Sequence, residues 1–233
     1  MGYPSASEVE MSNEPKVIGV APGGQKKPKA DKATKRKNSK EAIRRTFLSR
    51  LPKGGLAVEI GVWQGEFSPT ILKLIEPSQL FLIDPWKHIG EESHTTAFVG
   101  RTEDEKMEAI FQKVVKTFEA EIEEGKVGII RDFSVPALEL FDDESISFAY
   151  VDGDHSYEGV TADLAALFPK IKPSGIMAFD DYHRRGWWGD GVIRAVNEFL
   201  GQHPRELRIR AIAGAQIAIE KIVPQDDSKG QNN

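Results

Sequence analysis

The chain has no cysteine among its 233 residues, which excludes a disulfide framework and a zinc site built on thiolates. It also has no apolar run near the ~18 residues of a membrane-spanning helix. The first residues, MGYPSASEVE, lack the apolar segment of a secretory signal, and Ala6 breaks the pattern that would mark Gly2 for myristoylation. These absences predict a cytoplasmic protein that makes no membrane contact.

Charge is unevenly distributed along the chain. Residues 1–40 contain nine Lys or Arg and four Asp or Glu, a net charge of +5. The whole chain has a net charge of −5, so the remaining residues carry −10. The stretch KKPKADKATKRKNSK, residues 26–40, is either a segment for nucleic acid, an acidic partner or nuclear import, or a solvated arm without an apolar stripe. We favour the arm, and the acidic remainder of the chain argues against nucleic acid as the main substrate. We expect a disordered basic tail over 1–38, one domain over 39–223 and a disordered tail over 224–233.

Apolar runs of strand length alternate with amphipathic helical stretches. The last two runs are joined through Gly214, and so short a link requires an antiparallel pair. The pattern predicts a three-layer α/β sandwich around a seven-stranded, mostly parallel Rossmann-like sheet with a C-terminal antiparallel pair. The predicted strands are 56–60, 79–83, 127–131, 146–151, 175–179, 207–213 and 216–221. The predicted helices include 39–51 with Ser39 as its N-cap, 68–75, 102–125, a helix ending near Ile171 before Pro173 and Gly175, and 191–200.

Two acidic turns follow the strands 146–151 and 175–179. Asp152 ends the first strand and Asp180-Asp181 end the second, so parallel pairing brings all three carboxylates to one edge of the sheet. Converging carboxylates repel each other unless a cation lies between them, and hard oxygen ligands suit Mg²⁺ or Ca²⁺. The alternative is that each aspartate is a turn or helix-cap residue, which we favour for Asp154.

The first strand leads into a glycine-spaced turn, Gly61 to Gly65, before a helix that begins near Ser68-Pro69. Strand, glycine turn and helix form the geometry that cradles a nucleotide, although a plain connecting turn has the same pattern. Asp84 ends the second strand, 25 residues after Glu59, where an acid can accept both ribose hydroxyls. The pair predicts an adenosine cofactor. Residues 87–100 are polar and weakly periodic, and we expect them to form a loop over the site that could act as a lid.

Three motifs in this order, VEIGVWQGEFS, FLIDPW and YVDGDHSYEGVTADLAALFPKIKPSGIMAFDDY, resemble class I S-adenosylmethionine-dependent methyltransferases. The likeness covers roughly Ser39 to Val223 and is greatest to the branch with macrocin O-methyltransferase and related sugar- and natural-product-tailoring enzymes. One departure is Trp63, where the broader class has a glycine. The resemblance implies a cofactor loop of Glu59, Gly61 and Gly65, a ribose ligand in Asp84, adenine neighbours in Asp132 and Ser134, and Mg²⁺ ligands in Asp152, Asp180 and Asp181.

The resemblance implies O-methylation of a small hydroxylated acceptor, a sugar or natural product, with S-adenosylmethionine as cofactor and Mg²⁺ as an optional second one. The protein must align the reacting groups and remove the hydroxyl proton. His155 or His183 is the candidate base, because a neutral imidazole suits pH 7, and Asp152 is the alternative. A purely structural hydrogen bond stays open for each histidine.

Two other classes of protein fit parts of the sequence. A nicotinamide oxidoreductase is disfavoured, because the first loop is not G-x-G-x-x-G and no tyrosine has a lysine four residues on. A non-catalytic module that binds a partner through the basic tail has no need of Glu59, Asp84 and the acidic turns. The sequence leaves the identity of the acceptor open, and residues 87–100 and 183–190 should select it. It also leaves a homo-oligomeric state open.

Overall fold

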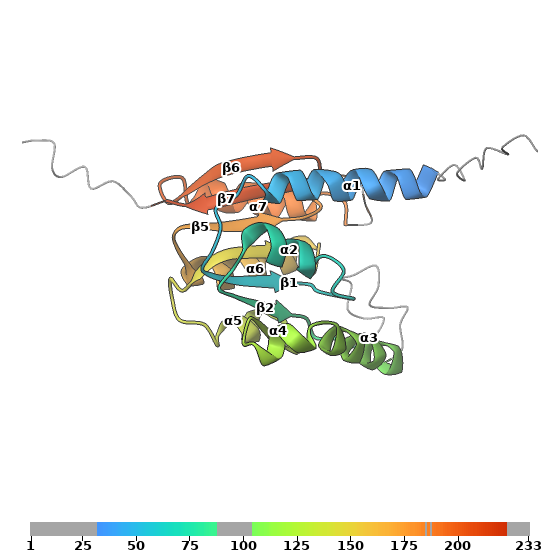
Figure 1. Cartoon of the computed structure of the whole chain (residues 1–233). Helices are drawn as coiled ribbons and strands as arrows, with labels where there is room; N and C mark the ends of the chain where they lie inside the picture. The colour runs from blue at the N-terminus through green and yellow to red at the C-terminus, as the bar shows by residue number, and fades with distance from the viewer. Residues whose placement is uncertain (1–31, 88–103, 185, 187, 223–233) are drawn as a thin grey trace, which may run out of the picture.

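The computed structural model describes residues 32–87, 104–184, 186 and 188–222, and only the backbone for 32–38. Strands and helices alternate along the chain (Figure 1). The strands are β1 (Leu56–Ile60), β2 (Gln79–Ile83), β3 (Val127–Ile130), β4 (Ile146–Val151), β5 (Ile171–Phe179), β6 (Leu207–Ala213) and β7 (Gln216–Lys221). The helices are α1 (Lys32–Leu48), α2 (Ser68–Ile75), α3 (Asp104–Thr117), α4 (Glu119–Glu123), α5 (Ser134–Leu138), α6 (Tyr157–Leu167) and α7 (Gly191–Gln202).

The seven strands form one sheet in the order β3-β2-β1-β4-β5-β7-β6. The pairs from β3 to β5 are parallel, whereas β7 runs antiparallel to both β5 and β6. This confirms the predicted mostly parallel sheet with its C-terminal antiparallel pair. The chain leaves β1 toward β2 on one side and returns to β4 on the other. Ligands bind open α/β sheets at such a reversal, so the sheet order points to the ends of β1 and β4.

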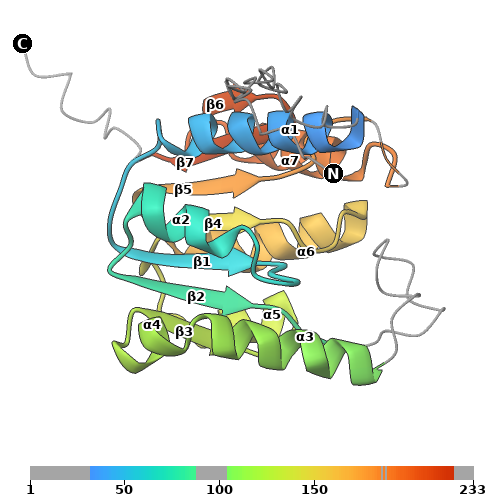
Figure 2. The same ribbon diagram turned by 45° about the vertical axis from the view of Figure 1, so that its right-hand side comes forward.

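Helices cover both faces of the sheet, as Figure 2 shows: α1, α2 and α3 lie on one face, and α5, α6 and α7 on the other. The strands supply both cores because successive side chains alternate between faces. In β1, Val58 and Ile60 pack with the α5–α7 layer, while Ala57 packs with Phe47 of α1 and Ile71 of α2. The three-layer sandwich predicted from the sequence is confirmed.

Two predicted helix limits were wrong. Helix α1 begins at Lys32, so Ser39 lies inside it and residues 32–38, which were assigned to the disordered tail, are helical. The single helix predicted over 102–125 is two helices, α3 and α4, separated at Phe118. Phe118 leaves the helical region with φ −108° and ψ 18°, and its side chain is 2% exposed among the core residues. Burial of this aromatic ring outweighs helix continuity.

The start of the fifth strand was also predicted wrongly. Helix α6 ends at Leu167, and a short 3₁₀ turn, Phe168–Lys170, leads directly into β5. Pro173 and Gly175 therefore lie within a strand, although the sequence suggested that they end a helix. The strand accommodates them because its register against β4 shifts between Ile146 and Phe148, and proline is tolerated at such irregularities.

Several sequence predictions concern segments that lie outside the described residues. They are the loop over the site, apart from Lys87, and both terminal tails beyond residues 32–38. Among the helices that the structure describes, none has the length and apolar character to cross a bilayer.

Candidate active site

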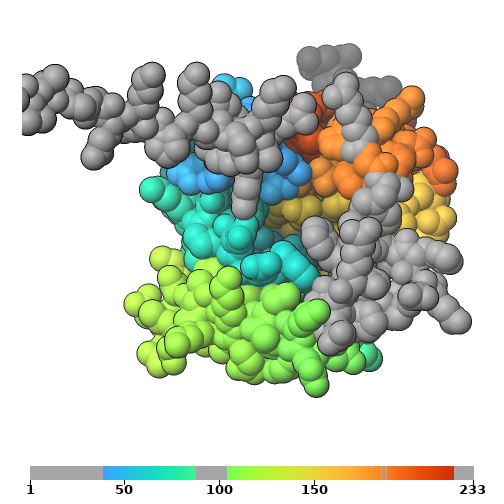
Figure 3. Space-filling model, turned by 90° about the vertical axis from the view of Figure 1, so that its right-hand side faces the viewer, coloured from blue at the N-terminus to red at the C-terminus, as the bar shows by residue number. Residues whose placement is uncertain are grey.

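A cavity of about 610 Å³ lies at the carboxyl ends of the parallel strands. Its walls come from the segments after β1, β2, β3, β4 and β5 and from helix α1. Figure 3 looks onto this edge of the molecule, where the teal segments after β1 and β2 lie between the blue α1 and the green α3. The cavity therefore includes the sheet reversal between β1 and β4.

The turn after β1 needs its two glycines for different reasons. Gly61 has φ +85°, and a Cβ there would lie 2.3 Å from the backbone oxygen of Asp152. Gly65 has φ +70°, and a Cβ there would lie 3.1 Å from the Phe118 ring. Trp63, the departure from the family pattern, also has a positive φ of 53°, a conformation that costs a bulky residue free energy. Such strain is often found at ligand sites, and here it aims the Trp63 backbone N–H at Asp84.

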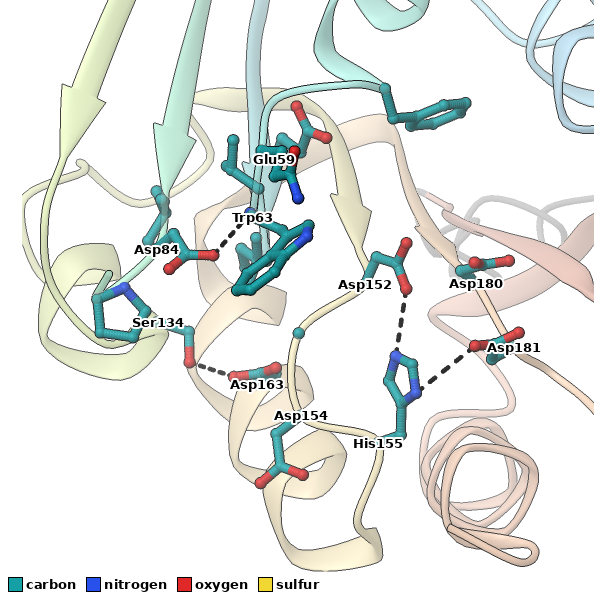
Figure 4. A pocket seen from close by; sticks show the side chains of 18 of the residues that line it. Glu59, Trp63, Asp84, Ser134, Asp152, Asp154, His155, Asp163, Asp180 and Asp181 are labelled. Carbon is teal, nitrogen blue, oxygen red and sulfur yellow. Dashed lines mark hydrogen bonds and ion pairs between the residues drawn. The ribbon is translucent and has the colours of Figure 1, made fainter. Parts of the chain in front are cut away.

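Asp84 is held at the end of β2 by backbone donors. Its Oδ2 accepts from the Trp63 N–H at 2.9 Å (Figure 4). Its Oδ1 accepts from the Trp86 N–H at 2.8 Å. The Trp86 indole N–H donates in turn to the Trp63 carbonyl at 2.8 Å. Burial raises the pKa of Asp84, and the backbone N–H groups offset part of that rise. The carboxylate is thus fixed in orientation at the cavity wall, where the sequence predicted a ribose ligand.

Glu59, the fourth residue of β1, is 2% exposed. Burial raises its pKa to about 8, and the Asp152 and Asp84 carboxylates add to that rise. The Ser68 hydroxyl and, more weakly, Arg44 act in the opposite direction. Within the described residues, Glu59 Oε2 has no hydrogen-bond partner. A buried acceptor without a partner is costly, so this oxygen is suited to a ligand that brings a donor or a positive charge.

The predicted adenine neighbours lie after β3. Asp132 is exposed beside the cavity, and Ser134 is the first residue of α5. The Ser134 hydroxyl donates to Asp163 of α6, which also lines the cavity (Figure 4). Burial raises the pKa of Asp163 to about 6. Sequence reasoning missed Asp163, although an acid on the apolar stripe between Val160 and Leu164 is itself a signal.

The turn after β4 places His155 between two carboxylates. His155 Nε2 lies 3.2 Å from Asp152 Oδ1, and Nδ1 lies 3.6 Å from Asp181 Oδ2 (Figure 4). The imidazole packs in a T-shaped arrangement with the Trp188 ring, with the ring centroids 4.9 Å apart. His183, the other candidate base, has its Nε2 3.4 Å from Asp181 Oδ1. Both histidines thus contact Asp181, but His155 is the one that also contacts the aspartate at the end of β4.

Asp154 has a local structural role, as we favoured from the sequence. Its Oδ1 accepts from the Ser156 N–H at 2.8 Å. The Ser156 side chain then caps α6 by accepting from the Gly159 N–H at 3.0 Å. This turn fixes the start of α6 and thereby the position of His155.

Helix α1 contributes two basic residues that sequence reasoning did not include. Arg44 forms ion pairs with Asp180 and, at 3.4 Å, with Asp152 Oδ2. Lys40 Nζ lies 3.3 Å from Asp180 Oδ2 and 3.1 Å from Asp181 Oδ1. The signal was helical spacing: Lys40 and Arg44 continue the stripe that buries Phe47, Leu48 and Leu51, and so face the sheet.

The three aspartates predicted as metal ligands do lie close together. The described residues whose ligand atoms lie within 4.8 Å of one another are Asp152, His155 and Asp181, with the histidine in place of Asp180. Asp180 accepts from the Gln216 amide and pairs with Lys40 and Arg44 instead. Asp152, His155 and Asp181 could together hold a divalent cation. However, Asp152 already contacts Arg44, and Asp181 already contacts Lys40.

Comparison with known proteins agrees with the geometry. Residues 58–182 match the family model described as "Methyltransferase domain", which is more than half of the chain. No curated protein matches the chain. The solved structures include a protein of Corynebacterium glutamicum with a TM-score of 0.55 and 15% identity, over 84% of this chain and 92% of that one.

Other solved structures with the same fold have named activities. A protein of Streptococcus mutans, assigned as a methyltransferase and in complex with SAH, gives a TM-score of 0.52 and 14% identity over 78% of this chain and 97% of that one. The O-methyltransferase NovP gives a TM-score of 0.50 and 17% identity over 81% of this chain and 80% of that one. An rRNA methylase of Streptococcus thermophilus shares the fold as well. Identities this low establish the fold, not the acceptor.

A Rossmann-like sheet with its cavity at the β1/β4 reversal is the architecture of class I methyltransferases. With the family model covering both acidic turns, the chain belongs to the methyltransferase-domain family. The class inferred by resemblance is confirmed, whereas the macrocin-like branch stays a prediction.

Proposed function

We propose that the protein transfers the methyl group of S-adenosylmethionine to a hydroxyl group of a small acceptor. The observation that carries the proposal is the arrangement of one cavity. Glu59, Gly61 and Asp84 line one end, and His155 lies between Asp152 and Asp181 at the other. A methyl donor and a hydroxyl acceptor need such adjoining sites, because the transfer is an in-line displacement.

The cofactor end fits an adenosyl sulfonium. Gly61 leaves room where a side chain would strike the Asp152 backbone, and Glu59 Oε2 lacks a partner among the described residues. Asp84 keeps lone pairs for ribose hydroxyls beyond its two backbone bonds. When bound, the cofactor supplies the methyl group. Asp132 and Ser134 are proposed to lie near its adenine, as the family resemblance implies.

At the other end, His155 is proposed as the general base. The carboxylates of Asp152 and Asp181 lie against the two ring nitrogens, so they hold the ring in the cavity and would stabilise the imidazolium that forms when His155 takes the acceptor's hydroxyl proton. Asp152 is the alternative base, and its 24% exposed side chain reaches the same cavity. The sequence predicted Mg²⁺ assistance with Asp152, Asp180 and Asp181 as ligands, which is the rival to a metal-free site. In the described structure, Asp152, His155 and Asp181 are the residues that would hold such an ion. The bound ion would lower the pKa of the acceptor hydroxyl.

A small acceptor is favoured over nucleic acid. The chain outside residues 1–40 carries a net charge of −10, and a nucleic-acid surface is expected to be basic. An rRNA methylase among the structures with this fold keeps RNA as the rival acceptor.

The test is transfer of a labelled methyl group from S-adenosylmethionine to two acceptor panels, one of sugars and phenols and one of RNA. We expect label on hydroxylated small molecules. Label only on RNA would contradict the acceptor class. Absence of S-adenosylhomocysteine binding by the full chain, measured calorimetrically, would contradict the methyltransferase proposal and favour a non-catalytic module.

A further inference from the structure

Helix α1 is anchored in the core just after Lys40 and Arg44, the two basic residues that contact the aspartates. Phe47 and Leu48 are 1% and 0% exposed, and Leu51 follows at 4%. Arg44 lies one helical turn before this anchor, and Lys40 lies one turn further back. The anchor therefore fixes which face of α1 meets the ends of β4 and β5.

Each of the three aspartates at those strand ends contacts a cation from α1. Arg44 pairs with Asp152 and Asp180, and Lys40 pairs with Asp180 and Asp181. The Asp180 side chain is 0% exposed, and its other oxygen accepts from the Gln216 amide. An unpaired buried carboxylate is costly, so the ion pairs with Arg44 and Lys40 and the hydrogen bond from Gln216 stabilise the charged form of Asp180.

The positive charges of Lys40 and Arg44 lie against the same carboxylates that would bind a divalent cation. A metal ion among Asp152, His155 and Asp181 would lie against carboxylates that Arg44 and Lys40 already contact. Repulsion from the two positive charges would oppose its binding, more strongly from Arg44, whose side chain is 18% exposed, than from Lys40, whose side chain is 47% exposed. Moreover, Mg²⁺ prefers oxygen ligands, and the available group contains an imidazole in place of the third carboxylate.

We propose that Lys40 and Arg44 take the place of a divalent cation at the acceptor end of the cavity. They neutralise the aspartates and hold Asp152 and Asp181 on either side of His155, so that the site needs no metal. They act as positioning residues. The effect on methyl transfer rests on the proposed function, whereas the effect on metal binding does not.

The inference is tested by titrating the full chain with Mn²⁺ and measuring bound ion by calorimetry and by electron paramagnetic resonance. The wild type is expected to show no saturable site at millimolar Mn²⁺. Removing both charges in Lys40→Met/Arg44→Met should create a site, with affinity higher by roughly tenfold or more. Adding Asp181→Asn to the double variant should abolish the gain.

Three control variants separate charge from structure. Arg50→Met removes one positive charge from an exposed position after α1 and should leave metal binding unchanged. Arg44→Lys keeps the charge and should bind no more Mn²⁺ than the wild type. Lys40→Met alone removes a side chain that is 47% exposed, so it should fold and show an intermediate gain if the double variant does not fold.

Two results would overturn the inference: stoichiometric Mn²⁺ uptake by the wild type, or folded Lys40→Met and double variants that gain no affinity. Calorimetry with S-adenosylhomocysteine on the same samples separates this failure from failure of the proposed function. Cofactor binding with wild-type metal uptake would overturn only the inference. Metal exclusion without cofactor binding would overturn only the function. If both hold, chelator should leave wild-type methyl transfer unchanged.

Discussion

The carboxylates at the two ends of the cavity differ in whether basic side chains contact them. At the proposed acceptor end, Asp152, Asp180 and Asp181 contact Lys40 and Arg44. At the proposed cofactor end, Glu59 and Asp84 are buried, and neither forms an ion pair with a basic side chain in the described part of the chain. Burial therefore raises the pKa of both, that of Glu59 to about 8.

This difference indicates which ligand brings charge. A site whose acids lack cations is completed by a positively charged ligand, and a sulfonium cofactor is one. A site whose acids are already paired suits an uncharged acceptor, since a further charge would be left unbalanced. The contrast agrees with the proposed direction of transfer, from a cationic donor at Glu59 to a neutral hydroxyl at His155.

The largest expected effect is at the acceptor end. His155→Gln should lower kcat by roughly 10²–10⁴-fold, because it removes the proposed base, while cofactor affinity stays unchanged. His183→Gln is the matched control, since His183 also contacts Asp181 but not Asp152, and should have a much smaller effect. Steady-state kinetics measures both. A greater loss of kcat in His183→Gln than in His155→Gln would indicate that His183, in the turn after β5, is the base.

The next effect is at the cofactor end. Asp84→Asn keeps the shape of the side chain but weakens its acceptance from the Trp63 and Trp86 N–H groups and from a ribose. S-adenosylhomocysteine should bind roughly 10–100-fold more weakly, the loss expected for hydrogen bonds to a charged group. Asp132→Asn, at an exposed carboxylate, should bind within a few-fold of the wild type. Equal losses of S-adenosylhomocysteine affinity in the two variants would contradict the proposed role of Asp84 as the ribose ligand.

A smaller effect concerns stability near the predicted adenine position. The pKa of Asp163 is about 6 in the folded chain and 3.8 for the free group. As pH rises, the unfolded chain releases this proton first, so the free energy of unfolding should fall between about pH 4 and pH 6. Asp163→Asn keeps an acceptor for Ser134 and should remove about 1–2 kcal/mol of that fall. Urea unfolding across this pH range measures it, with the exposed Asp142→Asn as control. An unchanged slope would contradict the assigned burial.

The parallel sheet and the acidic strand ends could be predicted because local patterns encode them. β1, β2, β4, β6 and β7 have the predicted limits, and Asp152 and Asp180 end neighbouring strands. What failed depends on contacts distant in the sequence. Pro173 lies in β5 because of a register shift against β4, and α3 ends where Phe118 enters the core.

Arg44 and Lys40 illustrate the same limit within the site. Lys40 reaches Asp181 and Arg44 reaches Asp152 across more than a hundred residues of sequence, so no local pattern joins them. Helical spacing could have indicated that they face the sheet, although the sequence analysis did not include them, and only the fold shows which strands they meet. The cavity wall with Glu59, Gly61 and Asp84 was easier to predict, because these residues lie in consecutive strand-end segments. Their role in cofactor binding stays a prediction.

The most direct test of the contrast between the two ends is proton release on cofactor binding. Calorimetry of S-adenosylmethionine binding at pH 7, in phosphate and in a buffer of high ionisation enthalpy, measures the number of protons released. Because the pKa of Glu59 is about 8, a cationic ligand beside it should expel up to about one proton. Glu59→Gln should bind without release. Cofactor binding whose heat is the same in both buffers for the wild type would contradict the account.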